Sequence, residues 1–225
     1  MEKASEYTFP FNHIQTYVKP ERLKRREVNL RRRWWIFKRT NEPMRNAIAR
    51  LNTYFIIPRV SKWSIFIPAG LDWLPGDKSV VLTTDDFYIL GIVTSKIHRS
   101  WMNSQKSTLG GTNAYTPTTC FETFPFPQTL DTKLVEKIRE KAKQLHQYRS
   151  EQMEAKQWGI TTLYNAFFDE PSSKLYKLHA ELDKFVMQAY HFKEKDDILE
   201  KLLELNLELA EKEKQGESII GSWAP

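Results

Sequence analysis

The sequence is poor in cysteine and has no long apolar run. Its 225 residues include one cysteine, Cys120, which excludes an internal disulfide framework and any metal site built from several cysteines. A single cysteine is typical of a reducing compartment, so we expect a cytoplasmic protein. No stretch approaches the roughly 18 apolar residues of a membrane span. Residues 1–12 also lack the basic start and apolar middle of a signal peptide, so no membrane partner is expected.

Glycine is scarce where a cofactor-binding methyltransferase or a nucleotidase would need it. Such sites place a glycine-rich turn between a strand and a helix, because backbone must approach the ligand closely. None of the eight glycines makes such a turn. The carboxylate pairs Asp85-Asp86 and Asp196-Asp197 are adjacent, so neither pair shares one face of a strand, and the five histidines are widely spaced. The sequence therefore predicts no catalytic or metal-binding residue, and an enzyme with an unrecognised site is a minor alternative.

Positive charge is concentrated in the first part of the chain. Residues 1–62 contain 15 Lys and Arg against 5 Glu, whereas residues 63–225 contain 19 Lys and Arg against 23 Asp and Glu. Lysines and arginines that displace counterions from phosphates supply most of the sequence-independent affinity for nucleic acid. The asymmetry therefore favours a polyanion-binding surface attached to a mildly acidic scaffold.

The densest basic stretch is residues 19–35, which reads Lys-Pro-Glu-Arg-Leu-Lys-Arg-Arg-Glu-Val-Asn-Leu-Arg-Arg-Arg-Trp-Trp. On a helical period, Arg22, Arg26 and Arg33 fall on one face, and Leu30 and Trp34 on the opposite one. This pattern predicts one amphipathic helix with a face for anions. A solvated basic helix edge is the plainer interpretation of the same charges.

The rest of the chain predicts an α+β fold, with a small mixed or antiparallel sheet, flanking helices and a following helical bundle. Residues 1–18 are expected to be an extended lead-in with a short turn of helix. A helix is expected over residues 96–105, with Ile97, Trp101 and Met102 buried and with His98 and Arg99 projecting from the core. Helical periodicity returns after residue 131 in three long segments. We therefore expect a recognition domain over residues 1–128 and a helical domain over residues 129–225. Four short apolar runs predict strands at residues 54–58, 63–67, 79–84 and 88–93.

Two loops have side chains suited to nucleic acid. Residues 58–62, Pro-Arg-Val-Ser-Lys, place two cations and a hydroxyl after the first strand, which suits phosphate binding, and arginine also reads guanine. Residues 107–114 carry short hydroxyl and amide side chains able to hydrogen-bond base edges. A charged surface hairpin and a flexible loop are the plainer interpretations.

These residues carry a family resemblance that extends from residue 18 to residue 192. The chain resembles the carboxyl-terminal region of MmeI-like restriction-modification enzymes in ordered blocks. The blocks are residues 18–22 (Val-Lys-Pro-Glu-Arg), 33–37 (Arg-Trp-Trp-Ile-Phe), 58–62, 115–119 (Tyr-Thr-Pro-Thr-Thr) with 121–127, and Leu163-Tyr164-Asn165 with Leu182-Asp183.

The resemblance implies a target-recognition domain and a terminal helical domain. Enzymes of this family join these parts to a nuclease and to an adenine-N6 methyltransferase that uses S-adenosylmethionine. The glycine-rich cofactor motif and the Asn-Pro-Pro-Tyr motif of that methyltransferase do not occur in this sequence. The cofactor is therefore expected on a catalytic domain that this chain lacks. Family members read bases partly with a variable loop before the Tyr-x-Pro-like block, which maps here onto residues 110–114.

We therefore expect a sequence-specific DNA target-recognition module of an adenine-N6 methyltransferase or restriction-modification system, with double-stranded DNA as its partner. The alternative is a scaffold that docks a separate methyltransferase polypeptide. Whether the chain belongs to an active enzyme is uncertain on sequence alone. The expected DNA contacts are basic or hydroxyl side chains for phosphates, Arg22, Arg26, Arg33, Arg59, Ser61 and Lys62, and the reading loop, Gly110, Gly111, Thr112, Asn113 and Ala114.

Overall fold

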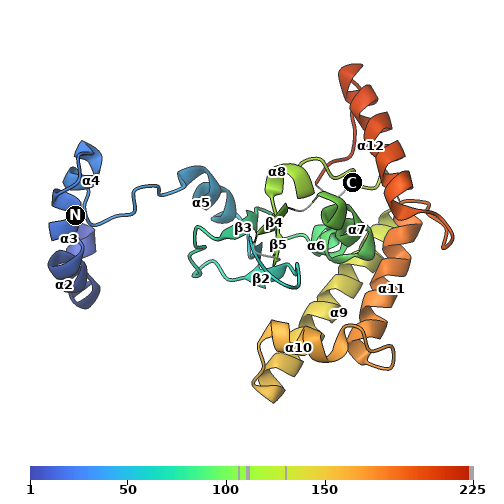
Figure 1. Ribbon diagram of the computed structural model, residues 1–225, viewed down its shortest axis with the longest axis horizontal. Helices are drawn as coiled ribbons and strands as arrows, with labels where there is room; N and C mark the ends of the chain where they lie inside the picture. The colour runs from blue at the N-terminus through green and yellow to red at the C-terminus, as the bar shows by residue number, and fades with distance from the viewer. Residues whose placement is uncertain (106, 110–111, 130, 223–225) are drawn as a thin grey trace. The chain divides into compact units, whose positions relative to one another are not determined.

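A computed structural model describes residues 1–105, 107–109, 112–129 and 131–222 of the chain. The chain divides into two compact units, Met1–Ala47 and Ile48–Pro225 (Figure 1). The fold is α+β, as the sequence predicts: helices predominate, and the sheets are small and antiparallel. Within the described ranges, none of the helices combines the length and the apolar composition that a bilayer crossing requires.

The first unit is helical, and two predictions for it are wrong. Residues expected to be an extended lead-in form helices α1 (Glu2–Ser5) and α2 (Thr8–Tyr17). The basic stretch is not one helix: α3 (Lys19–Leu23) and α4 (Val28–Arg32) are separated by a turn, and Glu27 has an extended backbone. The break lets the chain fold back, so that Trp34 is 6% exposed and its ring lies 5.6 Å from that of Phe11. Burial of the Trp34 ring against the half-buried Phe11 outweighs the few hydrogen bonds that a straight helix would add.

The second unit contains a three-stranded antiparallel sheet in the order β2-β1-β3. Its strands are β1 (Tyr54–Pro58), β2 (Ile67–Ala69) and β3 (Ser79–Leu82), with Ile56 opposite both Ile67 and Val81. The predicted strand at residues 63–67 is wrong because only its last residue pairs, and the strand continues through Pro68. Proline lacks the N–H that a central strand needs, and β2 is an edge strand, where this loss is tolerated.

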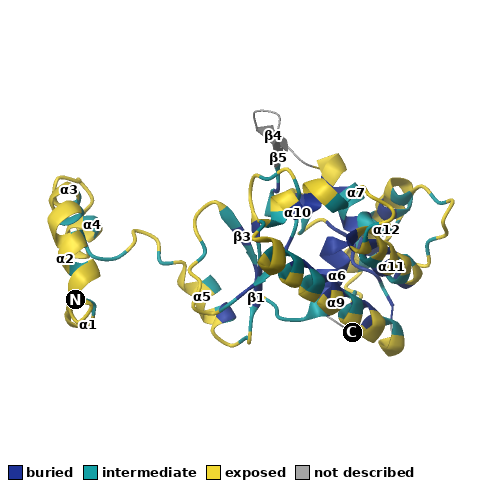
Figure 2. Ribbon diagram, turned by 90° about the horizontal axis from the view of Figure 1, so that it is seen from below, coloured by how far each residue is buried: buried dark blue, intermediate teal, exposed yellow. Residues whose placement is uncertain are grey.

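The predicted strand at residues 88–93 is also wrong, because these residues lie in helix α6 (Phe87–Thr94). Asp86 caps this helix: its carboxylate accepts a hydrogen bond from Tyr88 N at 2.8 Å and bonds from Arg139 at 2.7 and 2.9 Å. Burial alone would raise the pKa of Asp86, but these hydrogen bonds outweigh burial and lower it. Figure 2 shows α6 as a buried helix. A helix that is buried on all sides has no polar face, which explains why residues 88–93 are almost entirely apolar.

Helix α7 (Lys96–Gln105) has the predicted bounds, and Ile97, Trp101 and Met102 are buried as expected. The prediction that His98 projects from the core is wrong. His98 is 1% exposed, and its Nε2 lies 3.1 Å from Tyr115 Oη. Segments on several sides of α7 bury it over more than one face, which a single apolar stripe does not reveal.

The remaining helices form a bundle that shares one core with α6 and α7. The segment between β5 and the bundle contains the short helix α8 (Pro117–Cys120). In Figure 1, α11 lies beside α9. Ile89 and Phe124 belong to the same buried cluster as Ile138 and Leu182, so the core continues across residue 128. The domain boundary at that residue stays a prediction. The bundle helices are α9 (Thr132–Lys156), α10 (Ile160–Phe167), α11 (Lys174–Ala189) and α12 (Ile198–Lys214).

Gly91 allows the close approach of α6 to α9. A Cβ atom at this position would lie 2.7 Å from Ile138 Cγ2 and 3.4 Å from the Ile138 carbonyl oxygen. Gly91→Ala should therefore destabilise the protein by about 1–3 kcal/mol, the usual cost of overpacking a core. Chemical denaturation measures this change. Gly76→Ala is the matched control, because a Cβ there would meet nothing within 4 Å, and equal stability of the two variants would contradict the packing argument.

Candidate nucleic-acid interface

The predicted base-reading loop belongs to a β-hairpin that is anchored at its base. Strands β4 (Ser107–Leu109) and β5 (Thr112–Ala114) pair antiparallel, with Ser107 opposite Ala114. Ala114 also forms an antiparallel bridge with Val60, which follows β1. Gly110 and Gly111 lie outside the described residues, as do the side chains of Thr112 and Asn113. The structure thus brings the two predicted loops, residues 58–62 and residues 107–114, together through backbone contacts.

Arg59 stands at the junction of these two loops. Its backbone N donates to the Lys78 carbonyl oxygen at 2.8 Å, and its own carbonyl oxygen accepts from Tyr115 N at 2.7 Å. Both contacts fix the backbone, whereas the side chain is exposed. Among the described residues, none forms a hydrogen bond or an ion pair with the Arg59 guanidinium. The fixed backbone therefore holds the Arg59 guanidinium beside the hairpin. Little backbone entropy would be lost when this cation binds a ligand.

Ser61 and Lys62, predicted phosphate ligands, have internal partners. Ser61 Oγ donates to the Trp63 carbonyl oxygen at 2.8 Å. Lys62 Nζ donates to Asn165 Oδ1 at 2.7 Å, and Trp63 Nε1 donates to the same oxygen at 2.9 Å. Lys62 is nevertheless exposed, and an ammonium group has three donor hydrogens. DNA binding by Ser61 and Lys62 therefore stays a prediction.

Asn165 is a positioning residue whose role no local sequence pattern indicates. It lies on α10 and holds the loop that carries Arg59 through both Lys62 and Trp63. The ring of Trp63 packs 5.0 Å from that of Phe168, which caps the same helix. The only hint in the sequence is the block Leu163-Tyr164-Asn165, and its link to Lys62 spans more than a hundred residues. No local pattern encodes such a contact.

The other predicted DNA contacts belong to the first unit, and each has a different environment. Arg22 is half-buried, and its Nη1 donates to the Ile36 carbonyl oxygen at 2.9 Å, which stabilises the reversal of the chain. Arg26 lies in the turn between α3 and α4, and Arg33 is the C-cap of α4; both are exposed. Neither side chain contacts a carboxylate among the described residues. Arg26 and Arg33 are therefore the better placed of the three to meet phosphates.

Net charge supports an anionic partner for this unit. Residues 1–47 contain 12 Lys and Arg against 5 Glu. Two of the glutamates form exposed ion pairs, Glu21 with Lys24 and Glu27 with Lys38. Exposed pairs of this kind add little stability. They also leave most of the arginines without a counterion.

Neither a cluster of metal ligands nor a glycine-rich cofactor turn occurs among the described residues, and the location of S-adenosylmethionine on another domain stays a prediction. Within the described ranges, no three His, Cys, Asp or Glu side chains gather in a way that could hold a metal. Gly70 and Gly76 flank the β2–β3 connection, Gly91 is packed inside α6, and Gly159 is the N-cap of α10. None of these glycines forms the strand-to-helix turn that would bring backbone against a nucleoside cofactor.

Comparison with known proteins identifies the family. A family model described as the target recognition domain of MmeI matches residues 13–128, just over half of the chain. DNA methyltransferase A of Bacillus subtilis (strain 168) is 30% identical over an alignment of 188 residues, and the match covers 79% of this chain and 20% of that protein. In a solved structure, the type IIL restriction-modification enzyme MmeI in complex with DNA shares this fold. The TM-score is 0.64 at 20% identity, over 86% of this chain and 26% of that one.

The chain thus spans about a fifth of the curated relative and about a quarter of the solved structure. The family match begins within α2, at residue 13, and ends at residue 128, between α8 and α9. It therefore includes residues 13–47 of the basic first unit, the sheet, the anchored hairpin and Arg59. This chain belongs to the family of MmeI target recognition domains.

Proposed function

We propose that this chain is the DNA target-recognition module of an adenine-N6 methyltransferase in a restriction-modification system. Its family, and a relative that is a DNA methyltransferase, support this function. The observation that carries it is the hairpin β4–β5, held at its base by Val60 and Arg59 beside an exposed guanidinium. Methyl transfer and S-adenosylmethionine binding would belong to another part of a longer protein or to a separate polypeptide.

The geometry suggests a division of labour between positioning and reading. A two-stranded antiparallel ribbon fits the major groove of B-DNA, where each base pair presents a distinct pattern of donors and acceptors. The hairpin would therefore read bases with Thr112 and Asn113, and Ala114 would anchor it. Arg59 would meet a phosphate or a guanine edge next to the hairpin. Arg26 and Arg33 would hold phosphates, which position a protein without reading sequence.

Binding to duplex DNA should weaken steeply as salt rises. If Arg26, Arg33 and Arg59 each neutralise one phosphate, the affinity should fall about 40-fold between 50 and 200 mM monovalent salt. This estimate assumes a slope of about −0.9 per phosphate in a plot of log affinity against log salt. Fluorescence anisotropy of a labelled duplex measures it. An affinity that does not change over this range would refute the proposed DNA contacts.

Two substitutions separate positioning from reading. Arg26→Ala should weaken binding to all duplexes about equally, because a phosphate contact carries no sequence information. Asn113→Ala should change which sequences are preferred, with a loss of roughly 1–3 kcal/mol confined to the cognate site. Selection from a randomised duplex library, followed by titration of selected and unselected duplexes, reports both effects. A changed preference in Arg26→Ala would show that this division of labour is wrong.

A second candidate is a scaffold that docks a separate methyltransferase polypeptide. The observation in its favour is that the chain spans only a fifth of its curated relative, whose remaining parts a separate polypeptide would supply. Co-expression of the tagged chain with a candidate methyltransferase polypeptide tests this function. Stable co-purification together with negligible duplex binding by the chain alone would favour the scaffold over the self-sufficient reader.

A further inference from the structure

A groove in the second unit has no part in the proposed DNA contacts. Its volume is about 700 Å³, within the range of small-molecule sites. The side chains that line it come from the start of α7, the end of α10, one face of α11 and the segment that follows α11. Six of them matter here: Arg99, Phe168, His179, Asp183, Met187 and Phe192.

A small cavity adjoins this groove. The cavity has a volume of about 20 Å³, and it shares Arg99, Phe168 and His179 with the groove. Trp63, Ser64, Ile65, Thr94 and Tyr164 complete its lining. A space of this size accommodates one water-sized group, such as a single carboxylate oxygen. Groove and cavity form one site, and its narrow end (the polar end) brings His179, Arg99 and Thr94 together among otherwise mostly apolar walls.

The polar end contains a hydrogen-bond donor without an acceptor. His179 is 5% exposed, and its Nε2 lies 2.9 Å from Tyr164 Oη. Arg149 Nη1 donates to the same hydroxyl oxygen at 3.2 Å, so the tyrosine hydrogen is free to be donated to Nε2. Burial, with the charges of Arg99 and Arg149, lowers the pKa of His179, and the ring is neutral. When the tyrosine hydrogen is donated to Nε2, the ring hydrogen is on Nδ1, which has no partner among the described residues.

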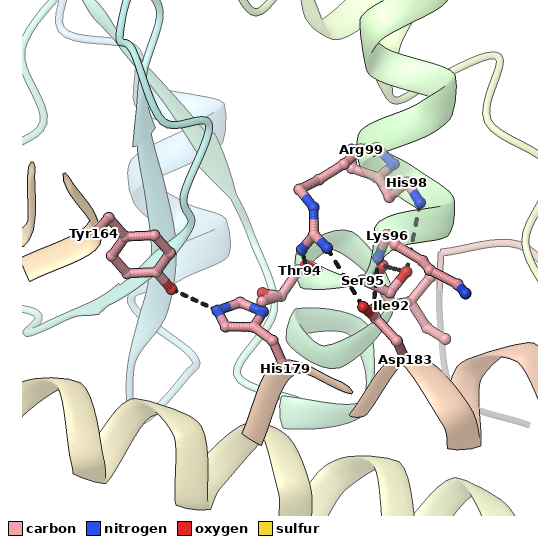
Figure 3. Close-up of polar contacts among 9 residues, drawn as sticks. All are labelled: Ile92, Thr94, Ser95, Lys96, His98, Arg99, Tyr164, His179 and Asp183. Carbon is pink, nitrogen blue, oxygen red and sulfur yellow. Dashed lines mark hydrogen bonds and ion pairs between the residues drawn. The ribbon is translucent and has the colours of Figure 1, made fainter. Parts of the chain in front are cut away.

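Other groups around His179 are also incompletely paired. Figure 3 shows Tyr164 on one side of the His179 ring and Thr94, Arg99 and Asp183 on the other. Within the described part of the chain, Thr94 Oγ1 lacks a hydrogen-bond partner, as do Nε and Nη2 of the buried Arg149. Buried polar groups without partners are costly, and native proteins rarely keep several of them side by side. Their concentration next to an open groove points to a ligand.

Charge specifies what kind of ligand would fit. Two guanidinium groups, those of Arg99 and Arg149, surround the ring, with the single carboxylate of Asp183 to balance them. That carboxylate already accepts bonds from Lys96 N at 2.6 Å and Arg99 Nη2 at 3.4 Å. The other charged residues of the groove lining balance each other, two lysines (Lys96 and Lys184) against two carboxylates (Asp169 and Glu194). One further negative charge would therefore balance the polar end.

We propose that this groove binds a small monocarboxylate with an aromatic or branched apolar body. One carboxylate oxygen accepts the hydrogen bond from His179 Nδ1, close to the Arg99 guanidinium. The apolar body lies against Phe168, Met187 and Phe192, where aromatic rings and a polarisable thioether make favourable contacts.

Calorimetric titration of the full chain at pH 7 tests this site with phenylacetate as the probe. A ligand of this size should bind with a dissociation constant on the order of 1 mM. Phenylacetamide, which has the same shape without the charge, should bind about fivefold more weakly. His179→Phe should weaken phenylacetate binding at least about tenfold, because it removes the donor and keeps an aromatic ring. In ¹⁵N spectra of the imidazole nitrogens, His179 should be the histidine whose signals move.

Two further variants keep the test decisive. Ala180→Trp fills the groove from an exposed position and should abolish binding without affecting the core. His13→Phe, on the exposed side of α2, should bind as the wild type does. The proposal is overturned if phenylacetate produces no heat or shift up to about 20 mM, if phenylacetamide binds equally well, or if Ala180→Trp binds like the wild type.

Discussion

Acidification from pH 7 to pH 4.5 should remove about 3 kcal/mol of unfolding free energy through His98 alone. Burial, reinforced by the nearby Arg99 charge, lowers the pKa of His98 from 6.5 to about 3. Below pH 6.5 the unfolded chain takes up a proton on this ring, whereas the folded protein takes it up only near pH 3. Stability is therefore fully present above pH 6.5 and is lost progressively as the pH falls towards 3.

Guanidinium denaturation at the two pH values measures this loss, with His98→Gln as the comparison. Glutamine still reaches towards Tyr115 Oη but has no titrating group. The stability advantage of the wild type over His98→Gln should shrink by about 3 kcal/mol between pH 7 and pH 4.5. His146, whose pKa burial and Arg149 lower to about 4, contributes in the same direction in both proteins and cancels in the comparison. An advantage that stays constant would contradict a buried neutral His98.

His98 also marks a limit of sequence interpretation. The period of Ile97 and Trp101 predicts helix α7 correctly, and the long stripes after residue 131 predict the bundle helices for the same reason. A stripe identifies one buried face, however, and α7 is buried on more than one. The run at residues 88–93 shows the converse problem, because an apolar segment of that length fits a buried strand and a buried helix equally well.

The candidate site was only partly predictable. The density of Lys and Arg correctly indicates the basic unit. The predicted single helix is interrupted where Trp34 becomes buried, and composition does not encode this packing. The sequence predicts two separate loops with side chains suited to DNA. Their connection through Arg59 and Tyr115 is a backbone contact between distant segments. The same is true of Lys62 and Asn165, because long-range pairs follow from the complete fold and not from local spacing.

The second large effect concerns Asp183, which connects α11 to α7. Its carboxylate caps the first turn of α7 through Lys96 N and forms an ion pair with Arg99 Nη2, and it is 9% exposed. Asp183→Ala should destabilise the protein by about 3–5 kcal/mol, the usual cost of leaving a largely buried charge without its partner. Burial raises the pKa of Asp183 despite these partners, which shows that ionisation of this carboxyl is itself costly.

Removing Asp183 also removes the cost of ionising its carboxyl. The loss of stability in Asp183→Ala should therefore come mainly from the Arg99 guanidinium, which is left without its carboxylate partner. Arg99→Met should therefore restore much of the stability lost in Asp183→Ala. The double variant Asp183→Ala with Arg99→Met should lose about 1–3 kcal/mol less unfolding free energy than the sum of the losses in the two single variants. Denaturation of the four proteins at pH 7 completes this cycle. Additive losses would mean that Asp183 acts through the Lys96 N–H alone, as a helix cap. A rescue would show that the charge pair holds α7 against α11 beneath the groove.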